Sequence, residues 1–352
     1  MVVIMAPEVS EEDVDAIVGL VRSAGGDAFV SRGVSRTIVG LVGDNAALGT
    51  LNLRGLRGVL DVVAISVPYK LVSRENHADR SVVRVGGVPI GPDTLTVIAG
   101  PCAVETPEQT LEAARLARAA GASLLRGGAF KPRTSPYAFQ GLGEAGLRIL
   151  ADVRGETGLP VVTEVVEPGA VELVAAYADM LQIGARNMQN FALLQAVGEA
   201  GRPVLLKRGF GATIDEWLMA AEYVALRGNL DIVLCERGIR TFETSTRNTL
   251  DIAAVPTAQR LSHLPVVVDP SHSGGRRELV APLTRAAIAV GADGVIIDVH
   301  PDPKTALCDG AQALTGPDIP EVANIAAVMA PLMGRSLTRP MSPADDPLVP
   351  VG

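Results

Sequence analysis

The chain has 352 residues, of which 48% are hydrophobic and 20% are charged, and its formal net charge is −8. A large buried core is therefore expected, and the acidic balance argues against a nucleic-acid or anionic-membrane partner. With no apolar run of about 18 residues, no signal-peptide pattern and only three scattered cysteines, the sequence predicts neither a membrane span nor a disulfide framework, and it favours a reducing, cytoplasmic setting.

Residues 1–70 predict a small separate unit. A β-rich start, MVVIM, precedes a segment with apolar residues at helical spacing, which lies between an acidic first turn and Gly25-Gly26. The runs DAFVSRG and RTIVGLVG predict a hairpin, and a weak helix and the strand VLDVVAISV follow. This β-α-β-β-α-β order is typical of a ferredoxin-like domain, with an irregular N-terminal extension as the alternative.

Residues 71–93 predict a connector with a hairpin at VVRVGGVPIG, and from Leu95 the pattern changes. Eight short apolar runs alternate with Ala/Leu-rich helical segments, and continuous apolar runs indicate strands buried on both faces. We therefore expect an α/β fold in which residues 94–335 form a (β/α)8 TIM barrel, with a doubly wound open sheet as the alternative. The Pro-rich residues 336–352 predict a flexible tail.

Polar side chains follow the predicted barrel strands. The carboxyl ends of these strands meet on one face of a TIM barrel, so the side chains are expected to share one cavity. A single cation after a strand is usually a solvated charge, but most of these strand ends carry one. Such a set predicts a multiply charged anionic ligand, such as a phosphate with a carboxylate. The cations are Arg126, Lys131, Arg133, Arg186, Lys207, Arg208 and Arg237, and the hydroxyls of Thr134 and Ser135 accompany them.

A second group of strand-end residues comprises Cys102, His272, Asp298 and Asp309. Thiolate, imidazole and carboxylate ligands suit Zn²⁺, Mn²⁺, Fe²⁺ or Co²⁺. Taken singly, Cys102 is equally explained as a small buried residue and His272 as a hydrogen-bonded loop histidine. We expect Cys235 and Cys308 to be structural, and His300 to be either a catalytic group or a loop residue.

Several of these motifs together resemble one enzyme family. They are IAGPCAVE (98–105), GGAFKPRTSPYAFQG (127–141), QIGARNMQNF (182–191), LLKRG (205–209), ERGIRTFE (236–243) and DPSHSGG (269–275). The chain is similar to 3-deoxy-D-arabino-heptulosonate 7-phosphate (DAHP) synthases of the subfamily that shares barrel features with 3-deoxy-D-manno-octulosonate 8-phosphate (KDO8P) synthase. The KDO8P enzymes typically have Asn where this chain has Pro132, so the loop favours DAHP synthase.

The resemblance implies a metal-dependent condensation of phosphoenolpyruvate with erythrose 4-phosphate, the first step of the shikimate pathway. It assigns residues as follows: Arg126, Lys131, Arg186, Lys207 and Arg237 to phosphoenolpyruvate; Arg133, Thr134 and Ser135 to erythrose 4-phosphate; and Cys102, His272, Asp298 and Asp309 to a divalent metal. The expected candidates for proton transfer are Lys131, Glu164 and His300.

Asp298 departs from the family pattern, which usually has Glu at this position. Because Asp is one methylene shorter, we expect a weaker or altered metal preference. The ferredoxin-like unit implies feedback inhibition by tyrosine or phenylalanine and a homodimer or homotetramer, or a role in subunit assembly alone. The alternative functions are a KDO8P-like or variant synthase that uses another aldose phosphate, a class II aldolase and a catalytically silent paralogue.

Overall fold

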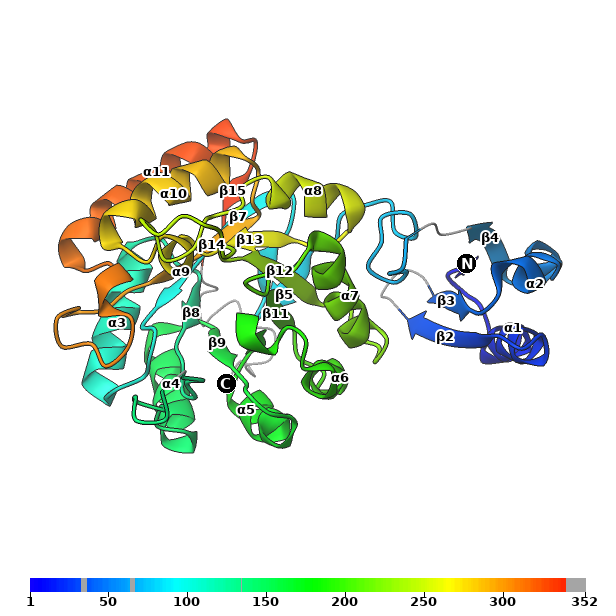
Figure 1. Cartoon of the computed structure of the whole chain (residues 1–352), viewed down its shortest axis with the longest axis horizontal. Helices are drawn as coiled ribbons and strands as arrows, with labels where there is room; N and C mark the ends of the chain where they lie inside the picture. The colour runs from blue at the N-terminus through cyan, green and yellow to red at the C-terminus, as the bar shows by residue number, and fades with distance from the viewer. Residues whose placement is uncertain (33–36, 64–66, 134, 340–352) are drawn as a thin grey trace, which may run out of the picture.

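A computed structural model describes residues 1–32, 37–63, 67–133 and 135–339, apart from the side chains of residues 45 and 46. Thr134 and residues 340–352 of the predicted tail lie outside the described residues. The chain forms a small N-terminal sheet domain beside a larger barrel (Figure 1). None of the helices formed by the described residues is long and apolar enough to cross a membrane.

The N-terminal domain has the predicted β-α-β-β-α-β order. Its elements are β1 (Val2–Met5), α1 (Glu11–Ser23), β2 (Asp27–Arg32), β3 (Thr37–Val42), α2 (Asn45–Gly49), the 3₁₀ turn η1 (Leu53–Gly55) and β4 (Val59–Val63). The strands form an antiparallel sheet in the order β2-β3-β1-β4. Helix α1 begins where the Ser10 hydroxyl accepts a hydrogen bond from the Asp13 amide, and it buries Val14, Ile17 and Val21 against the sheet.

Eight parallel strands close the predicted TIM barrel. They are β7 (Thr94–Gly100), β8 (Leu124–Arg126), β9 (Val161–Glu164), β10 (Met180–Ile183), β11 (Val204–Lys207), β12 (Ile232–Glu236), β13 (Val266–Val268) and β14 (Gly294–Asp298). Each strand pairs with the next along the chain, and β14 pairs with β7 in the register Gly294↔Thr96, which completes the barrel. An open doubly wound sheet is therefore excluded.

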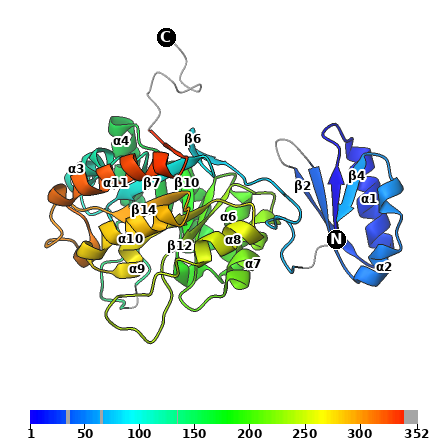
Figure 2. The same cartoon turned by 90° about the horizontal axis from the view of Figure 1, so that it is seen from above.

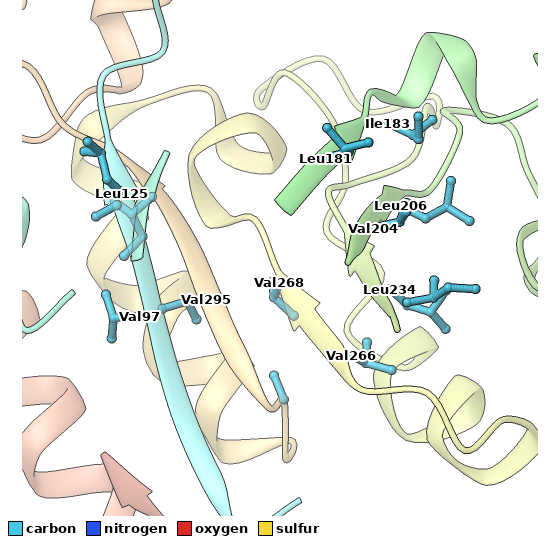
Figure 3. Close-up of a cluster of buried hydrophobic side chains, with 14 of the residues drawn as sticks. Val97, Leu125, Leu181, Ile183, Val204, Leu206, Leu234, Val266, Val268 and Val295 are labelled. Carbon is cyan, nitrogen blue, oxygen red and sulfur yellow. The ribbon is translucent and has the colours of Figure 1, made fainter. Parts of the chain in front are cut away.

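Helices surround the barrel and bury the outward side chains of the strands. The helices are α3 (Pro107–Ala119), α4 (Glu144–Thr157), α5 (Val171–Tyr177), α6 (Phe191–Glu199), α7 (Ile214–Ala225), α8 (Ala254–Leu261), α10 (Arg277–Ala289) and α11 (Ile319–Leu332). Figure 3 shows part of this layer, in which Val97, Leu181, Leu206 and Val268 belong to one buried cluster. The first two residues of the predicted tail form the short strand β15 (Ser336–Leu337). This strand pairs with the start of β7.

The predicted connector hairpin closes the amino end of the barrel. Strands β5 (Val83–Val85) and β6 (Val88–Ile90) are antiparallel, and Val83 faces Ile90 across the pair. Their apolar side chains form one buried cluster with inward residues from all eight barrel strands, including Ile98 and Val267. Because this end is filled by side chains, the opposite, carboxyl end is the one that remains available for a ligand.

The linker between the two units is fixed to the barrel by Glu222. Its carboxylate accepts hydrogen bonds from the backbone amides of Lys70, Leu71 and Val72, at 2.9, 2.8 and 3.1 Å. In Figure 2 the N-terminal sheet faces the barrel, while α1 and α2 lie on its far side. A cleft of about 820 Å³ lies between the sheet and the base of the barrel.

Candidate active site

The carboxyl ends of the strands surround a cavity of about 330 Å³. Ten of the predicted site residues line it: Arg126, Lys131, Arg133, Ser135, Glu164, Arg186, Lys207, Arg237, His272 and Asp309. The parallel strands carry these residues to one end, although almost 200 positions of the sequence separate the first from the last. The prediction of one shared cavity is therefore confirmed for these residues.

Part of the cation set is paired with carboxylates. Lys207 Nζ lies 2.5 Å from Asp269 Oδ2, and Arg126 Nη1 lies 3.0 Å from Asp298 Oδ1. Arg126 Nη1 also donates to the Pro101 carbonyl at 2.8 Å. Since both cations are almost fully buried, these fixed partners hold them in one orientation.

Arg186 and Arg237 belong to the part of the cation set that has no carboxylate partner. Among the described residues, no carboxylate lies within ion-pair distance of either guanidinium, and Nη1 of the buried Arg237 has no hydrogen-bond partner. Burial lowers the pKa of Arg237, and the nearby charges of Arg247 and Arg186 lower it further. An anion entering the cavity would relieve this repulsion and satisfy the unpaired donors.

The sulfur, imidazole and carboxylate groups form a compact cluster at one side of the cavity. His272 Nε2 lies 3.8 Å from Cys102 Sγ and 3.6 Å from Asp309 Oδ2, and Cys102 Sγ lies 3.1 Å from that oxygen. The short helix α9 (Pro270–Gly274) presents His272, and the Asp269 side chain caps its first turn. Asp309 has a φ of 52°, in the left-handed region that Asp tolerates better than most residues.

The donor set of this cluster fits a divalent cation. Asp269 Oδ2 lies 2.9 Å from His272 Nδ1, which leaves Nε2 directed toward the cluster. Burial alone would lower the pKa of His272, but the carboxylates of Asp269 and Asp298 outweigh it and raise the pKa to about 10. A cation at Nε2 would replace that proton, so the excess of negative charge around this ring suits a metal ion equally well.

Asp298 belongs to the same cluster, because its carboxylate lies within 4.8 Å of the ligand atoms of Cys102 and His272, but it does not line the cavity. Besides its ion pair with Arg126, its Oδ2 accepts a hydrogen bond from Gln312 Nε2 at 2.6 Å. The distance from Asp298 Oδ2 to His272 Nε2 is 3.6 Å. Both carboxylate oxygens are therefore already engaged by protein groups.

The loop after β8 supplies the other predicted anion contacts. Lys131 Nζ donates to the Cys102 carbonyl at 2.8 Å and lies 3.2 Å from Cys102 Sγ. Arg133 Nη1 lies 3.0 Å from Cys308 Sγ, and Ser135 is exposed at the rim. Thr134 cannot be placed, because it lies outside the described residues.

Two of the three residues predicted for proton transfer line the cavity. Lys131 and Glu164 do so, and Glu164 Oε2 accepts from Gln182 Nε2 at 3.2 Å. His300 is buried outside the cavity lining, where its Nε2 lies 3.4 Å from Glu105 Oε2. Its Nδ1 accepts a hydrogen bond from the Asp302 amide, so both ring nitrogens already have partners.

Comparison with known protein families identifies the family to which the chain belongs. Residues 71–333 match the DAHP synthetase I family, and residues 1–67 match the DAHP synthase ferredoxin-like domain. The chain belongs to the DAHP synthetase I family. The N-terminal domain and the barrel of this chain thus both match domains of DAHP synthases. The ferredoxin-like domain precedes the barrel, as the sequence predicted.

Individual proteins that are similar to this chain support the same family assignment. Phospho-2-dehydro-3-deoxyheptonate aldolase of Thermotoga maritima is 53% identical over 314 residues, which cover 89% of this chain and 93% of that protein. The crystal structure of the same-named Thermotoga maritima enzyme superposes with a TM-score of 0.76 over 96% of this chain, at 49% identity. A 2-dehydro-3-deoxyphosphooctonate aldolase of Syntrophotalea carbinolica is 39% identical, but the match covers only 64% of this chain.

The structure adds four residues to the site that the sequence did not predict there: Arg247, Gln312, Phe210 and Cys308. Arg247 Nη1 donates to Asp309 Oδ1 at 2.9 Å and to Gln312 Oε1 at 2.8 Å. Phe210 lines the cavity beside the unpaired arginines, and Cys308, which we expected to be structural, lines it beside Cys102. Only Cys308 carried a usable signal, because it directly precedes a predicted metal ligand.

Proposed function

We propose that this protein is a DAHP synthase, which joins C3 of phosphoenolpyruvate to the aldehyde carbon of erythrose 4-phosphate. Water adds at C2 of the phosphoenolpyruvate unit and phosphate leaves by C–O cleavage, so the products are DAHP and inorganic phosphate. The observation that carries this proposal is the cavity itself, where unpaired cations and a metal-type donor cluster face one another. Membership of the DAHP synthetase I family supports it independently.

Phosphoenolpyruvate takes the half of the cavity that is rich in cations. Arg186 and Arg237 have donors free for an anion, while Lys207 and Arg126 are held by carboxylates and orient the rest of the substrate. Fixing both reactants in this way converts a bimolecular encounter into an oriented one. The phosphate of erythrose 4-phosphate then binds toward the rim, near Arg133, Ser135 and Thr134.

Cys102, His272 and Asp309 hold the divalent cation, and Asp298 lies beside them. When bound, the cation supplies Lewis-acid polarisation of the aldehyde oxygen. Lys131 is within 3.2 Å of Cys102 Sγ and lines the cavity, so it is placed to hold a proton for the new alkoxide. Glu164 is the second candidate for this role, and His300 is a weaker one because its nitrogens are already engaged.

The test is consumption of phosphoenolpyruvate by purified protein with Mn²⁺, with erythrose 4-phosphate or arabinose 5-phosphate as acceptor. We expect rapid loss and phosphate release only with erythrose 4-phosphate, and loss of activity with a chelator. Arg186→Gln should raise the KM for phosphoenolpyruvate, whereas Arg202→Gln on the exposed surface should not. Preference for arabinose 5-phosphate would indicate a KDO8P-type enzyme, and carbon–carbon bond formation without phosphate release would indicate an aldolase.

The N-terminal domain is proposed to confer feedback inhibition by tyrosine or phenylalanine in a homo-oligomer. Two features support this: the match of residues 1–67 to the DAHP synthase ferredoxin-like domain, and the edge strand β4, on which Leu60 is 61% exposed. Deletion of residues 1–70 should abolish inhibition and spare condensation. Retained inhibition would assign the domain to subunit assembly alone. A cytoplasmic location stays a prediction.

A further inference from the structure

A second thiol lies at the donor cluster. Cys308 Sγ is 3.7 Å from Cys102 Sγ and 3.4 Å from Asp309 Oδ2, and its residue is only 6% exposed. Two sets of ligand atoms lie within 4.8 Å of one another, that of Cys102, His272 and Asp298 and that of Cys102, Cys308 and Asp309. The two sulfurs come from opposite ends of the barrel sequence, 206 positions apart, and they meet because β14 closes against β7.

Both oxygens of the Asp298 carboxylate already have protein partners. Its Oδ1 pairs with Arg126 and its Oδ2 accepts from Gln312, at 3.0 and 2.6 Å. Arg126 and Gln312 are themselves almost fully buried, so neither can turn toward water if Asp298 leaves. Moving Asp298 onto a metal ion would therefore take the acceptor away from the buried Gln312 amide, while Arg126 would keep only the Pro101 carbonyl.

We propose that Cys308 is a direct metal ligand beside Cys102, His272 and Asp309, and that Asp298 stays outside the coordination shell. This inference rests on the metal dependence in the proposed function. Asp298 then acts as a positioning residue that orients Arg126. In this proposal the thiol of Cys308 takes the place in the coordination shell that the usual Glu at position 298 would fill, because the shorter Asp298 binds Arg126 and Gln312 instead.

The sulfur positions are compatible with one shared ion. Two thiolates bound tetrahedrally at the usual Zn–S length of about 2.3 Å lie roughly 3.8 Å apart. The observed separation of 3.7 Å is close to this value. Donors already face both sulfurs: Lys131 Nζ is 3.2 Å from Cys102 Sγ, and Arg133 Nη1 is 3.0 Å from Cys308 Sγ. Such outer contacts stabilise thiolates bound to a metal.

A second thiolate changes which metals the site prefers. Thiolate ligands favour Zn²⁺ and Fe²⁺-type ions, while carboxylate ligands favour Mn²⁺ and Mg²⁺. We therefore expect the wild-type protein to discriminate strongly for Zn²⁺ or Co²⁺ over Mn²⁺. Replacing the thiol should reduce that discrimination rather than weaken all metals equally.

The deciding experiment uses the full-length protein, kept reduced and loaded with Co²⁺ as the probe. The thiolate-to-cobalt charge-transfer absorption should fall by about half in Cys308→Ala and stay unchanged in Asp298→Asn. Cys235→Ala is the matched control, because Cys235 is buried inside the barrel among apolar side chains and away from the cluster. An unchanged absorption in Cys308→Ala would overturn the proposal.

X-ray absorption on the zinc-loaded wild-type protein gives a second measurement that needs no variant. Two sulfur ligands per zinc are expected, and a single sulfur would also overturn the proposal. Both measurements are independent of turnover. A wild-type protein that binds zinc through two sulfurs but consumes no phosphoenolpyruvate would therefore refute the proposed function and leave this inference intact.

Discussion

The ring of Phe210 is the centre of an unusual concentration of positive charge. The guanidinium carbons of Arg237, Arg240 and Arg186 lie 4.6, 5.1 and 5.6 Å from its centroid. Among the described residues, none of these three side chains has an ion-pair partner. The Phe210 carbonyl also accepts a hydrogen bond from the Arg240 amide at 2.8 Å, which ties together the loops after β11 and β12. We infer that the ring holds Arg186 and Arg237 in place before an anionic substrate arrives.

Phe210→Leu keeps an apolar side chain but removes the π face. A cation–π contact contributes roughly 0.5 to 2 kcal/mol, more when the cation is desolvated. Arg237 is buried and close to the ring, while Arg186 is exposed and further away, so we assign about 1 and about 0.5 kcal/mol to them. The sum of about 1.5 kcal/mol predicts a rise of about tenfold in the KM for phosphoenolpyruvate. The kcat and the KM for erythrose 4-phosphate should change less than about twofold, because the substitution acts on ground-state binding of one substrate.

Steady-state kinetics with each substrate varied in turn would measure this split. Phe210→Tyr retains the π face and should keep the wild-type KM. Phe191→Leu is the matched control for loss of an aromatic ring, because Phe191 stacks on Tyr223 on helices away from the cavity. The reasoning would be refuted if Phe210→Leu left the KM for phosphoenolpyruvate unchanged, or if Phe210→Tyr raised it equally.

Three further predictions concern stability and the metal site. Glu222→Gln should lower the free energy of unfolding by roughly 2 to 4 kcal/mol, seen as an earlier urea midpoint, because the amide can no longer accept all three linker N–H groups; an unchanged midpoint would contradict this. Burial lowers the pKa of His263 from 6.5 to about 4. As the pH falls from 6.5 to about 4, His263 is therefore protonated in the unfolded chain but not in the folded one, and the folded state loses stability. Unfolding curves at pH 7 and pH 4 should show that His263→Gln loses less stability than wild type, and an equal loss would count against the assignment. Arg247→Leu removes the guanidinium that donates to Asp309 Oδ1 and should weaken metal binding by about 10- to 100-fold in a chelator competition, whereas unchanged affinity would show that this contact is dispensable.

The barrel could be predicted because its strands carry their own signal. A strand buried on both faces must be apolar throughout, as VVV at 266–268 and GVIID at 294–298 are, and a polar group after such a run falls at the carboxyl edge. Arg126, Glu164 and Lys207 were found in this way. The family resemblance then supplied roles that charge alone could not assign. The hairpin at 83–90 was predicted as a hairpin, but its alternating apolar residues did not indicate which core they would enter.

What the sequence determined by itself is therefore the order of elements and the end of the barrel at which chemistry gathers, because periodicity and strand-end polarity are local properties. The tertiary structure alone decided which of the gathered groups pair and which stay free. Asp298 is engaged by Arg126 and Gln312, Arg186 and Arg237 keep no carboxylate among the described residues, and Cys308 lies beside Cys102. Pairing depends on distances of a few ångströms between side chains far apart in the chain, and those distances are set only when the last strand closes on the first.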